Sequence, residues 1–369
     1  HITRFAKHLF STGTYNQATW GHEVVGLSNT DILALTRMAA SSCGIHQAMK
    51  CLTSTVCFCL SPRKHPWLRI ISDTFRLWFK VVANLSHSND DLHQAWKAAR
   101  EELASRNNNI RYVRGLLSNV VRLLRTLKWQ PVHEFRWVDP QGVAWESNPS
   151  GAGNSNLIIY ALQNTAEKVL WAKASQQHNG KGLEDGISYN HTIANTDYYR
   201  KHKDYSSSGA CEALLAAACW SPQRRFDANL INLEESKCKR CGDLLCDDLH
   251  QWWTCPAHES DNTPIIQSTQ KYVQDAVRQA QELPCLWLRG ILPAAKVKVP
   301  AQYTPSDNED PELVAACTLV WPPGKYGTDG SAGKFSAIPE LRRCGCSAVA
   351  LDINSNGVTV LRRLSCPLP

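Results

Sequence analysis

The sequence lacks the segments that direct a protein out of the cell or into a membrane. No charged stretch followed by an apolar one opens it, and no apolar run reaches the roughly 18 residues that a membrane span requires. We therefore expect a soluble intracellular protein with no membrane partner, and nothing in the sequence separates nucleus from cytoplasm. The first residue is His1 rather than methionine, as we expect of a piece of a longer chain.

Several catalytic motifs are also missing. There is no Gly-x-Ser-x-Gly elbow of the kind that presents a nucleophilic serine, and no Gly-rich phosphate loop ending in Lys-Ser or Lys-Thr. No internal repeat of 20 to 50 residues is visible. These absences argue against a serine hydrolase of that type, a P-loop nucleotidase and a repeat array, and we expect no small-molecule cofactor.

What the chain contains is a globular composition with an uneven charge. Its 369 residues, 43% of them hydrophobic and 20% charged, are enough for two or three domains with a substantial core. Residues 1–150 hold 18 Lys and Arg against 10 Asp and Glu, whereas residues 151–369 hold 22 against 23. The positive excess of the first half suits a polyanionic partner such as nucleic acid. The alternative is that the basic residues only aid solubility.

Cysteine is abundant, with 15 residues. This odd number would leave at least one thiol unpaired in a secreted, disulfide-bonded protein. Without a secretion signal, reduced thiols together with a metal site explain the count better than disulfides do.

Periodicity and composition indicate an α+β protein whose N-terminal two-thirds are mainly helical. The Asp139-Pro140-Gln141-Gly142 sequence between apolar arms predicts a hairpin turn. We expect five regions: helices with a basic helix and this hairpin at 1–150, further helices at 151–235, a small cysteine-rich module at 236–260, a helix and a Pro-rich acidic linker at 261–323, and antiparallel strands at 324–369.

The strongest local pattern is a Cys-x2-Cys-x8-His-x4-Cys spacing within the cysteine-rich module, formed by Cys238, Cys241, His250 and Cys255. Zinc prefers four tetrahedral sulfur and nitrogen ligands, and a site filled by four protein ligands is structural rather than catalytic. The glycine after Cys241 lets the backbone fold under the sulfur atoms. The spacing therefore predicts a zinc knuckle.

Other residues of this module leave alternatives open. Cys246 and His258 lie close enough in sequence to replace one of the four ligands. Trp252 and Trp253 could stack on nucleic-acid bases, although aromatic side chains in so small a module more often pack against the metal site.

An amphipathic basic helix is predicted between Ile110 and Trp129. At 100° per residue its four arginines fall within about 80° of arc, opposite a row of aliphatic residues; they are Arg111, Arg114, Arg122 and Arg125. Because guanidinium groups suit phosphate oxygens, this ridge is a candidate nucleic-acid contact. The alternatives are a solvated charged face and a helix that lies on a membrane surface.

Near the C-terminus, Thr328-Asp329-Gly330-Ser331 ends one expected strand, and two more strands follow, joined by an Asn356-Gly357 hairpin. Gly330 is expected to turn the chain sharply and leave the Asp329 carboxylate exposed at the strand end. This pattern resembles the start of a type-1 ribonuclease H domain, whose first strand carries the motif Thr-Asp-Gly-Ser. The expected fold is thus a truncated version of that domain.

The resemblance implies that Asp329 is a catalytic residue and a magnesium ligand. In that family a pair of Mg²⁺ ions activates the attacking water and stabilises the leaving oxygen, and the RNA strand of an RNA–DNA hybrid is cut. The implied partners are RNA–DNA hybrid or RNA.

The order of helices, cysteine-rich module and ribonuclease H-like strands also resembles the region after the polymerase core of non-LTR retrotransposon polyproteins. The polymerase motif itself, an aromatic-x-Asp-Asp turn, does not fit either Asp-Asp pair of this chain, Asp90-Asp91 or Asp247-Asp248. The alternative is a non-enzymatic zinc-containing protein that binds nucleic acid, in which Asp329 is only a turn residue. A decayed copy of a retroelement is a third possibility.

We expect the chain as given to have no ribonuclease activity. The family's other acidic ligands lie beyond the third strand, and the sequence given ends at Pro369, before that region. One carboxylate cannot hold two divalent cations. Incubation with a labelled RNA–DNA hybrid and Mg²⁺ should leave the RNA strand intact, whereas cleavage that is lost in Asp329→Asn would contradict this expectation.

Overall fold

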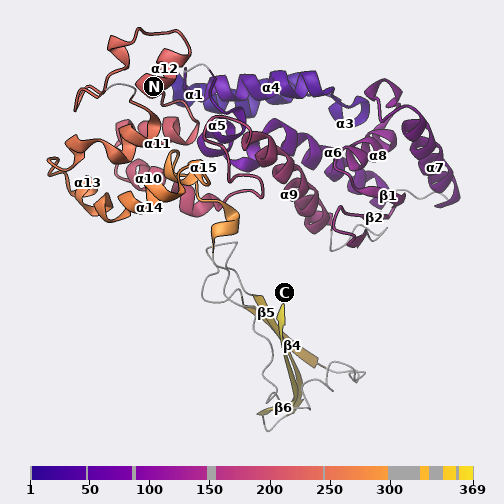
Figure 1. The fold of residues 1–369 in the computed structure, drawn as a ribbon. Coiled ribbons are helices and arrows are strands. Elements are labelled where there is room, and N and C mark those ends of the chain that lie inside the picture. The colour runs from indigo at the N-terminus through magenta and orange to yellow at the C-terminus, as the bar shows by residue number, and fades with distance from the viewer. Residues whose placement is uncertain are drawn as a thin grey trace. The chain divides into compact units, whose positions relative to one another are not determined.

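The computed structural model describes residues 2–46, 49–84, 89–147, 155–243 and 246–297, and the strands 325–331, 344–354 and 357–368. The chain forms two compact units, residues 1–294 and residues 295–369. The first unit is mainly helical with a small antiparallel sheet, and the second contains a three-stranded antiparallel sheet (Figure 1). The expected α+β class is thereby confirmed. Among the helices of these residues, none is long and apolar enough to cross a membrane.

The N-terminal half of the first unit is a bundle of helices. Its elements are α1 (Ile2–Leu9), η1 (Phe10–Thr14), α2 (Tyr15–Ala18), α3 (His22–Val25), α4 (Asn29–Ser42), α5 (Leu52–Cys59), η2 (Pro62–Lys64), α6 (Pro66–Ala83), α7 (Asn89–Ser105), η3 (Ile110–Tyr112) and α8 (Leu116–Thr126). Local sequence sets where two of them begin. The Ser28 hydroxyl accepts the Asp31 N–H in a capping box that starts α4, and Pro66 opens α6, where its missing N–H is not needed.

A small sheet closes one side of this bundle, with the strand order β1 (Gln130–His133), β2 (Arg136–Val138), β3 (Ala144–Glu146). The expected hairpin is confirmed, because Asp139 Oδ1 accepts the N–H groups of Gln141 and Val143 and fixes the turn. Trp137 on β2 is 1% exposed and packs on aromatic side chains of α6 and α7. The sheet is therefore fastened to the helical core by aromatic packing.

The C-terminal half of the first unit consists of shorter helices. They are α9 (Ser155–Ala174), α10 (Tyr189–Lys201), α11 (Tyr205–Leu215), α12 (Pro222–Asp227), η4 (Glu234–Ser236), η5 (His250–Thr254), η6 (Pro256–His258), α13 (Pro264–Thr269), η7 (Gln270–Tyr272), α14 (Val273–Gln279), α15 (Pro284–Trp287) and η8 (Ala294–Lys296). The one helix expected after residue 261 is broken into short pieces. Pro284 accounts for the last break, because proline cannot continue a helix but can begin one, here α15.

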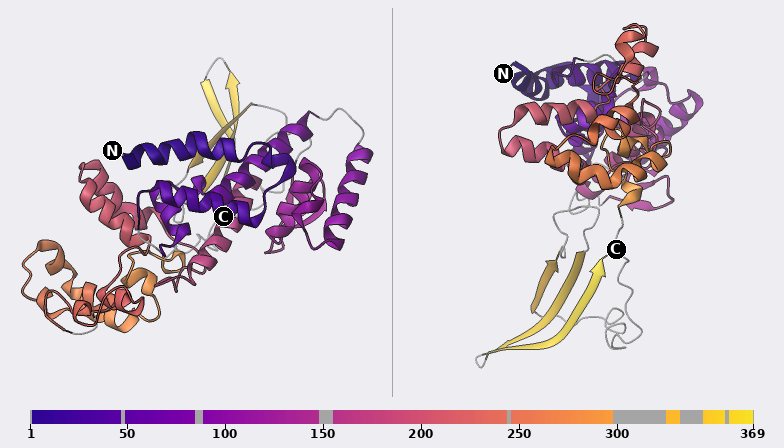
Figure 2. Two further views of the ribbon diagram at one scale, coloured as in Figure 1. Left: turned by 90° about the horizontal axis from the view of Figure 1, so that it is seen from above. Right: turned by 60° about the vertical axis from the view of Figure 1, so that its left-hand side comes forward.

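Two helices belong to both hydrophobic cores of this unit. On α5, Val56 faces the N-terminal core, while Cys57 and Phe58 face the second core. On α9, Ile158 to Ala166 pack in the first core and Trp171 and Ala174 in the second. In Figure 1 and Figure 2 both helices lie between the two halves. The boundaries expected at residues 150, 235 and 260 thus fall inside one compact unit.

The second unit contains β4 (Lys325–Ser331), β5 (Cys344–Asn354) and β6 (Gly357–Leu368), in that order across the sheet. The three consecutive antiparallel strands expected from the sequence are present. Most of the expected linker, from residue 298 to residue 323, lies outside the described residues.

Two details of this sheet differ from expectation. Gly330 pairs with Cys346 and Ser331 with Gly345, so Gly330 continues β4 and does not turn the chain. Asn354 pairs with Gly357, which places Gly357 in β6 rather than in the connection. Asn356 lies outside the described residues.

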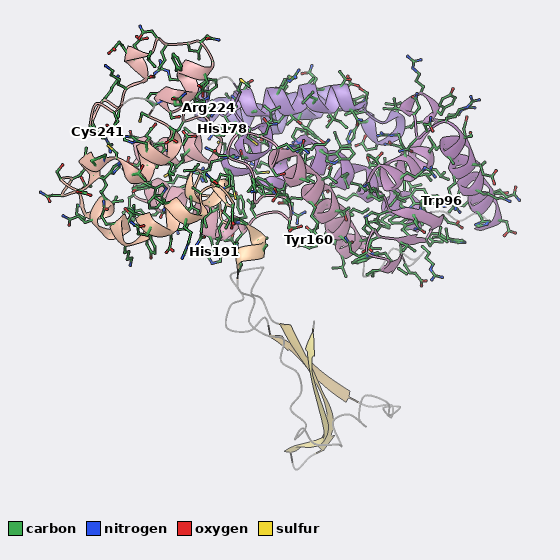
Figure 3. The ribbon with its side chains drawn as sticks, in the orientation of Figure 1. Trp96, Tyr160, His178, His191, Arg224 and Cys241 are labelled. Atoms are coloured by element: carbon green, nitrogen blue, oxygen red, sulfur yellow. The ribbon has the colours of Figure 1, made fainter. Side chains whose placement is uncertain are left out.

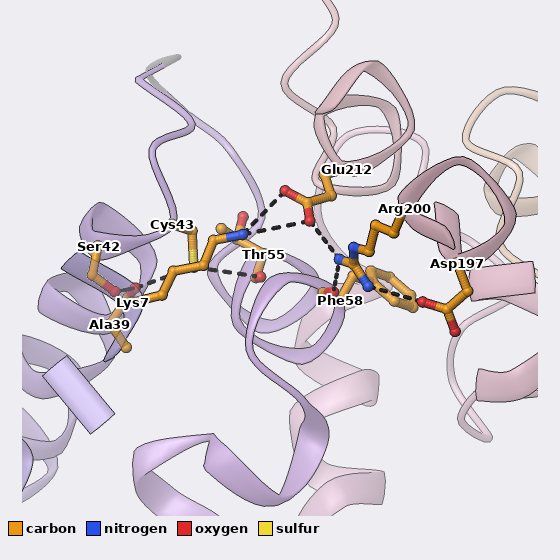
Figure 4. A network of polar contacts seen from close by, with 9 residues as sticks. All are labelled: Lys7, Ala39, Ser42, Cys43, Thr55, Phe58, Asp197, Arg200 and Glu212. Atoms are coloured by element: carbon orange, nitrogen blue, oxygen red, sulfur yellow. Dashed lines mark hydrogen bonds and ion pairs between the residues drawn. The ribbon is translucent and has the colours of Figure 1, made fainter. Parts of the chain in front are cut away.

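A charged network fastens α1 to the second half of the unit (Figure 4). The carboxylate of Glu212 on α11 lies between Lys7 of α1 and Arg200 of α10, and Lys7 Nζ is 3.3 Å from its Oε2. Arg200 also donates to Asp197 at 2.9 Å and to the carbonyl of Phe58 on α5. Glu212 is buried, so its charge depends on these two cations.

We expect Glu212→Gln to lower the free energy of unfolding by about 1–2 kcal/mol. The amide removes a charge from two charge-assisted hydrogen bonds, and the effect is limited because Lys7 and Arg200 keep partial contact with water. Equilibrium urea unfolding measures it, with the exposed Glu282→Gln as a matched control. Equal stability of the two variants would contradict a supporting role for Glu212.

Candidate functional site

The four residues predicted to bind zinc come together in space. Cys238 and Cys241 lie in the turn before residue 243, His250 begins η5, and Cys255 follows its end. The three sulfur atoms and the His250 ring nitrogen all lie within 4.8 Å of one another. A cluster of three thiols and one imidazole that could hold a metal ion is therefore part of the fold.

The separations inside this cluster fit tetrahedral zinc. Zn–S bonds of about 2.3 Å and Zn–N bonds of about 2.0–2.1 Å at tetrahedral angles place two sulfurs about 3.8 Å apart, and sulfur and nitrogen about 3.6 Å apart. The Cys238 and Cys255 sulfurs are 3.7 Å apart, and Cys241 Sγ lies 3.3 Å from His250 Nε2. A single Zn²⁺ ion would need only small side-chain movements to bind all four.

The backbone around Cys238 explains why these side chains converge. Gly242 has φ +84°, a conformation open to glycine, and its N–H donates to the Cys238 carbonyl at 2.8 Å. Burial opposes ionisation of Cys238, but the backbone N–H groups of Cys241 and Arg240 at its sulfur lower its pKa to about 6. The turn thus favours the thiolate, which is the form that binds metal.

The alternative ligands Cys246 and His258 do not belong to the group of four ligand atoms. His258 Nε2 is 3.2 Å from the carbonyl oxygen of Gln251 and 3.3 Å from Arg240 Nη1. Cys246 is buried beside the cluster, where burial and then the neighbouring Cys238 raise its pKa to about 12. Both residues line the centre without completing it.

The cysteine-rich module is docked onto the rest of the first unit. Asp248 lies 2.7 Å from His178 Nε2 and accepts a 2.7 Å hydrogen bond from Asn179. Trp253 donates to the Trp287 carbonyl on α15, and the two indole rings meet edge to face. Trp253 therefore packs against α15, outside the cysteine-rich module, whereas Trp252 remains 36% exposed.

The arginine ridge predicted between residues 110 and 129 is not formed. Gly115 separates η3 from α8, so Arg111 and Arg114 precede the helix that carries the other two. Arg114 pairs with Glu102 on α7 at 2.9 Å. Arg122 is 5% exposed, where burial lowers its pKa to about 10, and it donates to Asn119 Oδ1. Tertiary packing therefore places Arg122 of α8 in the interior of the protein.

A basic groove between α7 and α8 was not predicted. Two adjoining hollows of about 400 and 410 Å³ share Arg100 and Arg125 in their walls. Lys97 lines the first and Lys128 the second, and Glu101 is the acidic residue of the lining. Arg125 Nε is buried with no hydrogen-bond partner among the described residues. In the sequence, only the i, i+3 spacing of Lys97 and Arg100 indicated this groove. That spacing predicts a basic face on one helix, and the groove also depends on where α8 lies in the fold.

Asp329, the residue that resembles a catalytic aspartate, lies in β4 opposite Ser347 of β5. Its side chain is outside the described part of the structure, and so is any magnesium site that it could form. The strand assignment is the part of this prediction that the fold bears out.

Purified protein dialysed against a mild chelator should retain close to one equivalent of zinc. Cys255→Ser should release it, because a hydroxyl replaces one of four ligands, while Cys246→Ser at the edge of the same cluster should retain it. Elemental analysis measures the ratio, and Co²⁺ substitution should give thiolate charge-transfer bands only where the cluster is intact. Metal loss in Cys246→Ser but not in Cys255→Ser would contradict the ligand set.

No protein-family model, no curated protein and no solved structure matches the chain.

Proposed function

We propose that this chain is a nucleic-acid-binding segment of a retroelement polyprotein. Its first unit contacts RNA or RNA–DNA hybrid, and the strands from Lys325 onward begin a type-1 ribonuclease H domain. The binding function rests on one observation, the groove between α7 and α8. Its two adjoining hollows share Arg100 and Arg125, and Lys97 lines one of them and Lys128 the other.

The electrostatics of the groove favour phosphate. Four cations face a lining that contains one carboxylate, Glu101, and the surrounding half of the chain also carries the positive excess. Phosphate groups along a nucleic-acid strand neutralise such a row and release counterions, which drives binding.

The zinc centre has a different part in this proposal. Trp96, beside the groove, and Cys241, in the metal cluster, lie at opposite ends of the first unit (Figure 3). The cluster is closed by four protein ligands, which suits a structural ion. We therefore assign it to folding the cysteine-rich module onto α15, and the phosphate contacts to the groove.

The order of modules supports the retroelement origin. Helices, a Cys₃His cluster and three consecutive antiparallel strands follow one another, with Asp329 in the first strand. A non-enzymatic zinc-containing protein that binds nucleic acid is the alternative. In this alternative the basic groove and the Cys₃His cluster have the same roles, but Asp329 binds no metal.

Replacing Lys97 and Lys128 together by alanine should weaken binding to a short labelled RNA–DNA hybrid. Both side chains are exposed, so the substitutions should leave the fold intact. The slope of log affinity against log salt should become shallower by almost 2, at about 0.9 per lost phosphate contact on a B-form duplex. Fluorescence anisotropy over a salt series measures both quantities.

The matched control replaces the exposed Lys168 and Lys201, which removes the same charge from other helices. This control should bind like the unmodified protein. If both double variants lose affinity equally, binding depends on net charge and the groove has no special role. Arg111→Ala tests the original ridge hypothesis and should have little effect.

A further inference from the structure

A second cluster of metal-binding side chains lies where α7 meets the turn between β1 and β2. His93 comes from the start of α7, His133 ends β1, and Glu134 follows it. Oε2 of Glu134 lies 3.0 Å from His93 Nδ1 and 3.3 Å from His133 Nδ1, and the imidazole centroids are 4.9 Å apart. The three ligand atoms lie within 4.8 Å of one another. The cluster shares no residue with the Cys₃His centre.

Burial makes this carboxylate unusual. The Glu134 side chain is 1% exposed, whereas the His93 and His133 side chains are 50% and 44% exposed. A buried carboxylate is costly unless positive charge or hydrogen bonds compensate it. The two imidazoles are the side chains that face it in the described structure, so compensation must come from them or from an ion that they help to bind.

The contacts of His133 Nδ1 limit its ability to donate a hydrogen bond to Glu134. Its Nδ1 lies 3.4 Å from the Phe135 backbone N and 3.3 Å from Glu134 Oε2. When Nδ1 accepts the Phe135 N–H it carries a lone pair there and cannot also donate a proton to the carboxylate. A lone pair and a carboxylate oxygen 3.3 Å apart repel each other. A cation between them converts this repulsion into two favourable contacts.

The donor set and its spacing match a first-row transition metal. Metal–nitrogen and metal–oxygen bonds of about 2.0–2.2 Å place two ligand atoms about 2.9 Å apart at a right angle and about 3.4 Å apart at a tetrahedral angle. The two nitrogen–oxygen separations of 3.0 and 3.3 Å fall in this interval. Two imidazoles and one carboxylate are a ligand set that zinc and its neighbours accept.

The scaffold holds these ligands together without a metal. One turn along α7 from His93, Trp96 donates to the Pro131 carbonyl at 3.2 Å, and Arg100 donates to the Val132 carbonyl at 2.7 Å. Both bonds fasten β1 along α7, so His93 and His133 stay opposite each other. Trp96 is fully buried and stacks on Trp137 of β2. Such preorganisation reduces the ordering that metal binding requires.

We propose that His93, His133 and Glu134 bind one divalent transition-metal ion, Zn²⁺ or Co²⁺, at a site separate from the Cys₃His centre. Three protein ligands leave at least one coordination position open. His93 also lines the basic groove, so the ion is reachable from solvent. This site does not depend on nucleic-acid binding and exchanges its metal more readily than the closed cysteine centre.

The test titrates Co²⁺ into the full chain whose Cys₃His centre is already filled with zinc. One further equivalent should bind and give weak visible bands without thiolate charge transfer, since no sulfur is among the ligands. His93→Gln should abolish this equivalent and leave the zinc content unchanged. His93 is half exposed, so its substitution should not unfold the protein. Glu134→Gln should abolish it as well, with circular dichroism to check the fold.

The exposed His202→Gln at the end of α10 is the matched control and should keep the additional equivalent. Failure of the unmodified protein to bind additional Co²⁺ would overturn the proposal, since the His93–Glu134 and His133–Glu134 contacts would then be contacts between side chains only. Binding that survives in His93→Gln would overturn it too, because the ion would then lie elsewhere.

Discussion

The shared burial of α5 and α9 is the constraint on which the first unit depends. Each helix contributes one set of side chains to the N-terminal core and another to the second core. Removing either half would expose apolar surface on both helices, so neither half can keep its packing alone. The network around Glu212 strengthens the same junction with charge, since it connects α1, α10 and α11 beside α5. Cys241 of the metal cluster and Trp96 beside the basic groove lie at the two ends of this framework (Figure 3).

The sequence predicted best where all determinants are local. The four cysteine and histidine ligands lie within 18 residues, so the spacing alone indicated that they converge, and Asp139 specified its hairpin turn in the same way. The prediction of an arginine ridge is wrong for two reasons. The helix does not continue through Gly115. Arg122 lies in the interior, where it donates to Asn119, and Asn119 in turn donates to a carbonyl of α3. The prediction of a sharp turn at Gly330 is wrong, because pairing with β5 keeps the strand extended there.

The basic groove and the His93–His133–Glu134 cluster illustrate what a sequence pattern cannot show. Their residues come from helix and strand segments about 30 to 40 positions apart, and only the packing of α7 on α8 and β1 makes them neighbours. Lys97 and Arg100 resemble an ordinary solvated helix face until Arg125 and Lys128 are placed opposite. Glu134 resembles a surface residue of a turn in the sequence, whereas its side chain is 1% exposed in the structure.

Because α5 packs in both hydrophobic cores, one of its faces stays uncovered while the protein is being synthesised. Cys57 and Phe58 share this core with Leu215, Cys285 and Ile291, which leave the ribosome more than 150 residues after them. The nascent chain must therefore carry an apolar helix face without its final cover until those later residues have been made. The N-terminal bundle can collapse first, but its last helix surface closes only when the chain beyond α15 arrives.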